Sequence, residues 1–185
     1  MDSPTRWVYT WAWVIALCFC AFALAYKFYL NAPREVLRIT PTVGAVGSTH
    51  AHASLLVMDR NNAVSFCAKK YMLASQVAHF EDDDCTVVHK HATGVTLDTF
   101  LKTIEVSLTD SCFTVAGGPP LCNDAKNTLR VVLNGKEVKA STLPYYELRN
   151  NDHILINYGP ETGALLRFKY NQVPNIPLDV NEPVQ

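Results

Sequence analysis

The feature that most restricts how this chain can fold is a stretch near its start, Trp7 to Tyr26, that contains no charged residue. A helix of about 20 residues, rising 1.5 Å per residue, reaches across the roughly 30 Å hydrocarbon core of a bilayer. Aromatic residues gather at both ends of the stretch, as they do where a transmembrane helix meets the headgroups: Trp7, Tyr9, Trp11 and Trp13 at one end, Tyr26 and Tyr29 at the other. We expect residues 1–30 to form a single-pass transmembrane helix that anchors the chain in a lipid bilayer.

A cleaved signal peptide is the alternative interpretation of this stretch, because Ala23-Leu24-Ala25 matches a small-x-small cleavage pattern. Two features favour the retained anchor. The positive charge before the stretch is a single arginine, Arg6, partly offset by Asp2, and the apolar run is longer than that of a usual signal peptide.

Two observations disagree about the side of the membrane on which the rest of the chain lies. Lys27, Arg34 and Arg38 follow the apolar stretch, and positive flanks favour the cytoplasmic side. Cys112 and Cys122, however, bracket a loop of glycines and prolines that can turn back on itself. A disulfide between these two cysteines persists only in an oxidising compartment. We give the cysteines more weight and expect the C-terminal domain outside the cytoplasm.

The 185 residues leave room for one domain plus appendages. Residues 31–48 contain prolines, glycines and small residues and are expected to form a stalk, and residues 49–159 the folded domain. Residues 96–104 show the apolar period of a helix, with Thr96 placed to cap it. Strands are expected in the following segments: HASLLVMDR, NAVSFCA, QVAHFE, TVVHKHATG, LRVVLNGKEVKAS with a hairpin at Asn134-Gly135, and DHILINYG.

These elements predict an α+β domain with about six to eight strands and one helix. The run from VVLNGKEV to DHILINYG resembles the last part of ubiquitin-like β-grasp domains, and the resemblance implies a β-grasp-like fold. After Pro160 the prolines at 174, 177 and 183 predict an extended tail over residues 160–185.

A His-x-His-Ala phrase occurs twice in this domain, in THAHAS and in VVHKHATG. Alternate residues of a strand share a face, so His50 and His52 point to one side of their strand and His89 and His91 to one side of theirs. If the two strands are neighbours, or face each other across a small barrel, four imidazoles converge. Imidazole nitrogens suit zinc and copper. We therefore expect a transition metal ion, zinc or copper, to be the cofactor.

His79 is a candidate fifth ligand. Glu81 follows it by two residues and is expected on the same face of the strand, where its carboxylate can orient a metal-bound histidine. The alternative is that these histidines are half-exposed polar residues that follow from strand alternation alone. His153 is expected to be structural. For Cys67 and Cys85 the sequence leaves the role open, a second disulfide being one option.

Other functions find little support in the sequence. A formal net charge of −1 with interleaved lysines and acids argues against a nucleic-acid partner. No nucleophile elbow, phosphate loop or dinucleotide-binding glycine pattern is present. We name no catalytic residue and expect a binding protein rather than an enzyme.

The order of several short motifs resembles that in a poorly characterised group of proteins. These motifs are HAHA, HFE followed by VVHKHATGVT, the cysteine pair after LTDSC, LNGKEV and DHILINYG. Its members are single-span membrane proteins, mostly archaeal and bacterial, with an exported domain, and some carry a disulfide-isomerase label. This chain has no CxxC motif, and Asp83-Asp84-Cys85 stands where the group more often has glycines. The resemblance implies an anchored, exported domain in which His50, His52, His89 and His91 matter.

The leading hypothesis is a membrane-anchored domain that binds a transition metal through the two His-x-His pairs. The second is a non-catalytic accessory subunit of a larger membrane complex, in which the anchor and the tail contact other subunits.

Overall fold

The computed structural model of the chain describes residues 4–31, 40–115 and 117–176, and in its first helix it describes side chains for residues 14–27. The chain divides into two compact units, Met1–Arg38 and Ile39–Gln185. The first unit contains helix α1, Pro4–Asn31. Among the residues whose side chains the structure describes, which in α1 are residues 14–27, no helix combines the length and the apolar character needed to cross a membrane.

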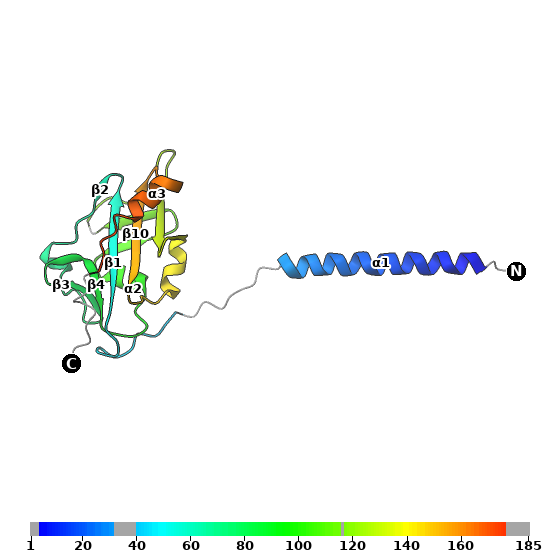
Figure 1. Cartoon of the computed structure of the whole chain (residues 1–185), viewed down its shortest axis with the longest axis horizontal. Coiled ribbons are helices and arrows are strands. Elements are labelled where there is room, and N and C mark those ends of the chain that lie inside the picture. Colours follow the sequence, from blue (N-terminus) through cyan, green and yellow to red (C-terminus); the bar gives the residue numbers. More distant parts are fainter. Residues whose placement is uncertain (1–3, 32–39, 116, 177–185) are drawn as a thin grey trace. The chain divides into compact units, whose positions relative to one another are not determined.

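The second unit is α+β and is built on a mixed seven-stranded sheet (Figure 1). Its strands lie in the order β3-β4-β1-β10-β8-β9, with β2 pairing on β1. A three-stranded sheet, β5-β6-β7, completes the strands of the described residues. The strands are β1 Ala51–Asp59, β2 Asn62–Ala63, β3 Ala78–Glu81, β4 Asp84–Lys90, β5 Val106–Leu108, β6 Cys112–Val115, β7 Leu121–Cys122, β8 Thr128–Leu133, β9 Lys136–Val138 and β10 Asp152–Gly159. The helices are α2 Leu97–Thr103 and α3 Gly163–Tyr170, with 3-10 turns η1 Lys69–Tyr71 and η2 Ala140–Tyr145.

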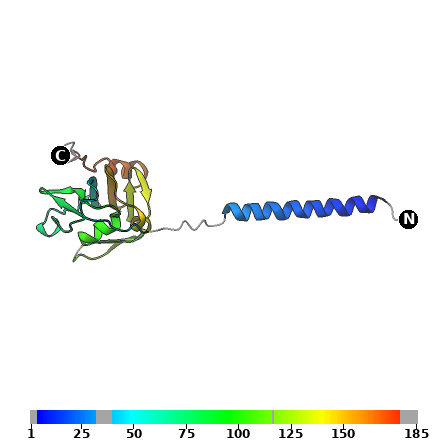
Figure 2. The same ribbon diagram turned by 90° about the horizontal axis from the view of Figure 1, so that it is seen from below.

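The centre of the large sheet is the parallel pair β1 and β10, in which Leu55 lies beside Ile154 and Val57 beside Ile156. The remaining pairings of this sheet are antiparallel. Seen from below, the β8-β9 hairpin lies at one side of the unit and the β3-β4 region at the other (Figure 2), as expected for the two edges of the sheet. The strongly apolar, β-branched run of β10 fits this central position, where both faces are covered.

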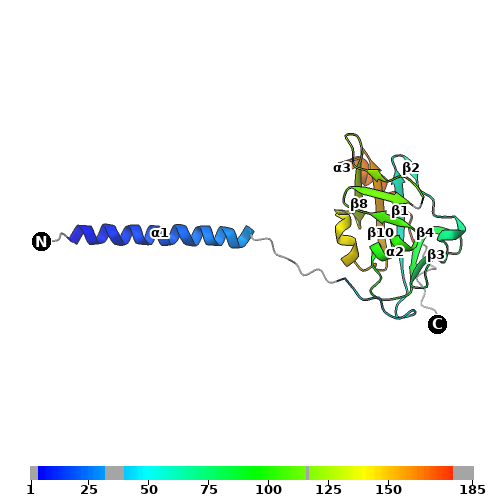
Figure 3. The ribbon, with the colours of Figure 1, turned by 180° about the vertical axis from the view of Figure 1, so that it is seen from behind.

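The two faces of the sheet carry separate apolar clusters. The main cluster holds the odd-numbered side chains of β1, the buried face of α2 and Phe113 of the small sheet. The second cluster lies on the other face, where Leu166 of α3 and Val173 cover Met58, Val132 and Leu155. Figure 3, drawn from behind, shows α2 on the viewer's side of the large sheet. Burial on both faces explains why seven of the eight residues in β10 are buried.

Helix α2 forms where the sequence predicts it. Thr96 caps its start, with the side-chain oxygen accepting a hydrogen bond from the Thr99 backbone N–H at 3.1 Å. Leu97, Phe100 and Ile104 of its apolar stripe are fully buried. The hairpin at Asn134-Gly135 is also confirmed, and both residues have the positive φ that a tight two-residue turn requires.

Two boundaries differ from those expected. Residues 163–170 form helix α3, so the prediction of an extended conformation from residue 160 is wrong for this part, because Leu166 packs on the second cluster with Tyr170 one turn later. Residues 40–48, expected in the stalk, belong to the compact unit, since the backbone N–H groups of Gly44 and Gly47 donate to the carbonyls of Thr93 and His91. The remainder of the expected stalk and tail, residues 32–39 and 177–185, lies outside the described residues.

Two disulfides close loops of the second unit. The expected bond joins Cys112 to Cys122, which pair across β6 and β7. A second disulfide joins Cys67 to Cys85, so the cysteines whose role the sequence left open are paired with each other. Cys18 and Cys20 of α1 are free.

We expect Cys112→Ser/Cys122→Ser to lower the free energy of unfolding by about 2–3 kcal/mol, because opening a loop of this length restores conformational freedom to the unfolded chain. Denaturant titration of the full chain in mild detergent measures the change. Cys18→Ser/Cys20→Ser is the matched control, since it replaces free thiols. Equal stability of the two double variants would contradict the expectation.

Candidate metal centre

Five of the six histidines lie on or beside three neighbouring strands, β3, β4 and β1 (Figure 1). In the antiparallel pairing of β1 with β4, His52 lies opposite His89. On the other side of β4, His79 of β3 also lies opposite His89. One pair further along, the rings of His50 and His91 lie 4.9 Å apart between centroids. Because these positions share strand parity, the rings gather on one face of the sheet.

Three imidazole nitrogens meet in what we call the first histidine group, His50, His52 and His89. The Nε2 atom of His52 lies 3.0 Å from Nε2 of His50 and 3.1 Å from Nδ1 of His89. A neutral imidazole carries one N–H, so Nε2 of His52 can donate to only one of these two nitrogens. A cation bound among the three nitrogens would satisfy all their lone pairs at once.

The spacing of these nitrogens fits a shared ion. Two ligand atoms bound at about 2.0–2.1 Å lie roughly 3.0 Å apart at a right angle and roughly 3.4 Å apart at the tetrahedral angle. The two observed separations, 3.0 and 3.1 Å, are close to this range. Two of the three pairs of nitrogens therefore already have the spacing of ligands to one zinc or copper ion.

The second group consists of His79, Glu81 and His91, whose ligand atoms lie within 4.8 Å of one another. Nδ1 of His79 lies 2.5 Å from the backbone carbonyl oxygen of Ser75, which can only accept a hydrogen bond. In the neutral ring this contact places the proton on Nδ1 and leaves the lone pair on Nε2. Metal-bound histidines are commonly oriented by such a carbonyl.

Glu81 lies between the two groups. Its Oε1 atom is 2.7 Å from Nδ1 of His89, in the first group, and its Oε2 atom is 2.9 Å from Nε2 of His79, in the second. The register of β3 against β4 shifts between residues 79 and 81. Irregularities in a strand pair, such as β-bulges, redirect side chains and are frequent beside functional sites.

The surroundings favour the protonation states that metal ligands need. Burial lowers the pKa of His89 and of His91 below the ordinary imidazole value, although Glu81 opposes the shift at both. Burial alone would raise the pKa of Glu81, but its hydrogen bond with His79 and its attraction to the neighbouring imidazoles outweigh burial, so the pKa is lowered. These shifts favour neutral imidazoles at His89 and His91 beside an ionised Glu81 carboxylate, which is the ligand state that binds metal ions.

Lys90 stands between two of the ligands in sequence, but its side chain points to the opposite face of the strand. Its ammonium group donates to Oε1 of Glu147 at 2.6 Å and to the carbonyl of Leu148 at 2.7 Å. The same carboxylate oxygen accepts from the backbone N–H of Gly94 at 2.7 Å. These contacts hold the Lys90 ammonium group away from the imidazoles. Beside the imidazoles, its positive charge would oppose cation binding.

All five histidines expected as ligands come together, and Glu81 lies on their face as its parity predicted. The sixth histidine, His153, lies in β10 and joins neither group of the described residues. The sequence did not identify the carbonyl of Ser75, or the side chain of Asn150, which accepts from the backbone N–H of His52 at 2.9 Å. No residue pattern marks a backbone carbonyl as an orienting group.

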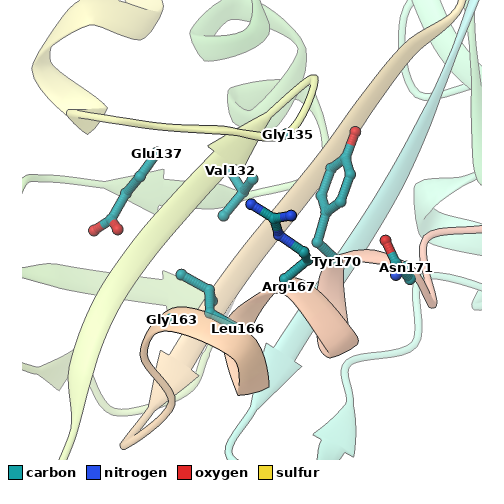
Figure 4. A pocket seen from close by; sticks show the side chains of 8 residues that line it. All are labelled: Val132, Gly135, Glu137, Gly163, Leu166, Arg167, Tyr170 and Asn171. Carbon is teal, nitrogen blue, oxygen red and sulfur yellow. The ribbon is translucent and has the colours of Figure 1, made fainter.

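A hollow of about 400 Å³ lies elsewhere, between α3 and the β8-β9 hairpin (Figure 4). Arg167 and Tyr170 rise from α3 beside Val132, and Glu137 projects from the hairpin. The hollow shares no residue with the two metal-ligand groups.

Comparison with protein-family models, with curated proteins and with solved structures finds no match to this chain.

Without metal, the unfolding free energy should fall as the pH drops from 7.5 to 5.5. The folded-state pKa of His89 and of His91 lies below the value of about 6.5 in the unfolded chain. Below pH 6.5 the unfolded chain thus takes up protons that the folded state excludes, and stability is lost. Denaturant titration of the full chain with a chelator at several pH values measures the slope.

His89→Gln/His91→Gln should show a shallower pH dependence over this window, which stays above the range in which carboxylates titrate. An unchanged slope in this double variant would show that other groups set the pH dependence.

Proposed function

We propose that the second unit binds a transition metal ion through its histidine cluster, for a structural, delivery or sensing purpose. The observation that carries the proposal is the convergence of His50, His52 and His89, whose nitrogens lie 3.0 and 3.1 Å apart around His52. Two distant parts of the sequence supply these rings, and the strand register brings them together.

Zinc and copper fit this ligand set best. The set contains five imidazoles and one carboxylate, and the four cysteines of the second unit are bound in disulfides, so no thiolate competes for the ion. Sites made of imidazole with little carboxylate suit zinc and copper, whereas magnesium and calcium prefer oxygen.

Binding rather than catalysis is the role proposed. His52, His79 and His89 are only 2, 8 and 4 % exposed, and Glu81 already contacts two imidazoles. A hydrolytic centre needs an open coordination position and a free general base. Because the histidines are buried and Glu81 already contacts two imidazoles, the site favours holding an ion over catalysing a reaction.

His50→Gln/His91→Gln tests the proposal with little risk to folding, because His50 is exposed and His91 half-buried. The double variant removes one imidazole from each group, and we expect its apparent affinity for Zn²⁺ to fall at least about tenfold. Competition titration and the metal content of full chain purified in mild detergent measure the effect. The control is His153→Gln, which removes a histidine outside both groups. Equal zinc affinity and metal content in wild type and double variant would refute the proposal.

We also propose a β-grasp-like scaffold for the second unit. The parallel pair β1-β10 at the centre, flanked by β4 on one side and the β8-β9 hairpin on the other, supports this interpretation, as does the position of α2 between them in the chain. Many unrelated functions occur on one fold, so the scaffold adds nothing to the metal proposal.

The proposed location is a membrane surface outside the cytoplasm, with α1 as the anchor. The charge-free stretch from Trp7 to Tyr26, with aromatic residues at both ends, supports an anchor. The two disulfides support an oxidising compartment, because cytoplasmic thiols are kept reduced.

The location is tested by thiol labelling in intact cells: Cys112 and Cys122 should react with a membrane-impermeant maleimide only after treatment with an impermeant reductant. The anchor is tested by an alkaline carbonate wash, after which the chain should stay in the membrane pellet. Leu17→Arg, which puts a charge in the middle of the stretch at a cost of about 2.5–3.5 kcal/mol, should release more chain into the supernatant. Free thiols that react only with a permeant maleimide would contradict the location, and carbonate release of wild-type chain would contradict the anchor.

A further inference from the structure

The six ligand residues divide into two sets of three, one from β1 with β4 and one from β3 with the end of β4. We propose that the centre holds two metal ions, one in each group, and that the Glu81 carboxylate bridges them. This inference rests on the proposed function, because it specifies how many ions the same cluster takes.

The number of ligands favours two ions over one. Zinc sites in proteins take four ligands in nearly all structural cases and three plus an open position in the others, so six ligands exceed what one such ion uses. Ring centroids of neighbouring histidines lie 4.7 and 4.6 Å apart in the first group and 4.9 Å apart in the second. The groups adjoin at His50 and His91, whose rings also lie 4.9 Å apart. His79 and His89, from different groups, lie 6.5 Å apart and nearly parallel, with an angle of 14° between their planes. The two rings thus lie side by side, and Nε2 of His79 and Nδ1 of His89 both face the Glu81 carboxylate.

The two oxygens of Glu81 each address a different group. Oε1 is 2.7 Å from Nδ1 of His89, and Oε2 is 2.9 Å from Nε2 of His79. A carboxylate that binds one ion through each oxygen holds the ions roughly 3.5–4 Å apart, the spacing common in two-metal sites. One carboxylate placed between two sets of imidazoles has the arrangement of such a bridge.

The second group has its own evidence for an ion. Nδ1 of His79 faces the Ser75 carbonyl and Nε2 faces Oε2 of Glu81, and both oxygens can only accept hydrogen bonds. A neutral ring has one proton, so one of these contacts pairs two lone pairs unless the ring becomes an imidazolium. A cation between Nε2 and Oε2 removes the conflict and leaves the proton on Nδ1, in the common arrangement of a metal-bound histidine.

The test is a Cu²⁺ titration of the full chain in mild detergent, read by metal stoichiometry and by electron paramagnetic resonance. Two ions per chain, with a resonance signal weakened by coupling between neighbouring Cu²⁺ ions, is the expected result. His50→Gln and His91→Gln, each damaging one group, should each reduce the stoichiometry from two to one and restore the uncoupled signal. His153→Gln should keep two coupled ions.

Glu81→Gln keeps the shape of the side chain and removes the negative charge. We expect this variant to lose the coupling, with the ion of the first group retained because its three imidazoles are unchanged. One ion in the wild type, bound more weakly in both single histidine variants, would overturn the two-ion centre and leave the proposed function intact. Two uncoupled ions would overturn the bridge, and no bound ion would end both proposals.

Discussion

The register between β1 and β4 determines almost everything described for the candidate centre. With His52 opposite His89, the two His-x-His pairs of an antiparallel ladder face each other ring to ring, and His50 meets His91 at the next pair. A shift of β1 by one residue would turn His50 and His52 to the apolar core, since strand faces alternate. The odd-numbered side chains of β1 prevent such a shift, because Ala53, Leu55 and Val57 are buried in the main cluster. The same burial that folds the sheet thus aligns the imidazoles.

His52, His79 and His89 are buried on a face of the sheet that α3 covers only in part. The main cluster fills one face, and α3 with Val173 covers part of the other. The histidines lie on this second face, at the end of β1 opposite to Met58, which contacts α3. Ring-to-ring contacts, the Ser75 carbonyl and the Glu81 carboxylate supply the polar partners that buried imidazoles require.

Strand alternation is enough to predict which histidines share a face, and it also predicts that Glu81 lies on the same face as His79. Alternation could not say which strands are neighbours, because β1 pairs with β4 and β10 across long stretches of sequence. Helix α3 was missed because GALLRFKY is short and leaves Leu165 and Phe168 65 % exposed, so its apolar period is weak. The pairing of Cys67 with Cys85 likewise depends on a spatial approach that no spacing rule provides.

Because β3 is an edge strand of the large sheet, metal binding at the centre would also affect how firmly this edge is held. A short strand at the edge of a sheet opens more easily than a central strand. β3 has four residues and pairs along its length with β4 alone, while its outer side carries an isolated bridge between Phe80 and Met72. His79 and Glu81 belong to this strand, whereas His52 belongs to the interior of the sheet. Ions bound by residues of β3, β4 and β1 would cross-link the edge strand β3 to the interior of the sheet. Loss of metal would then loosen β3 before the central strands.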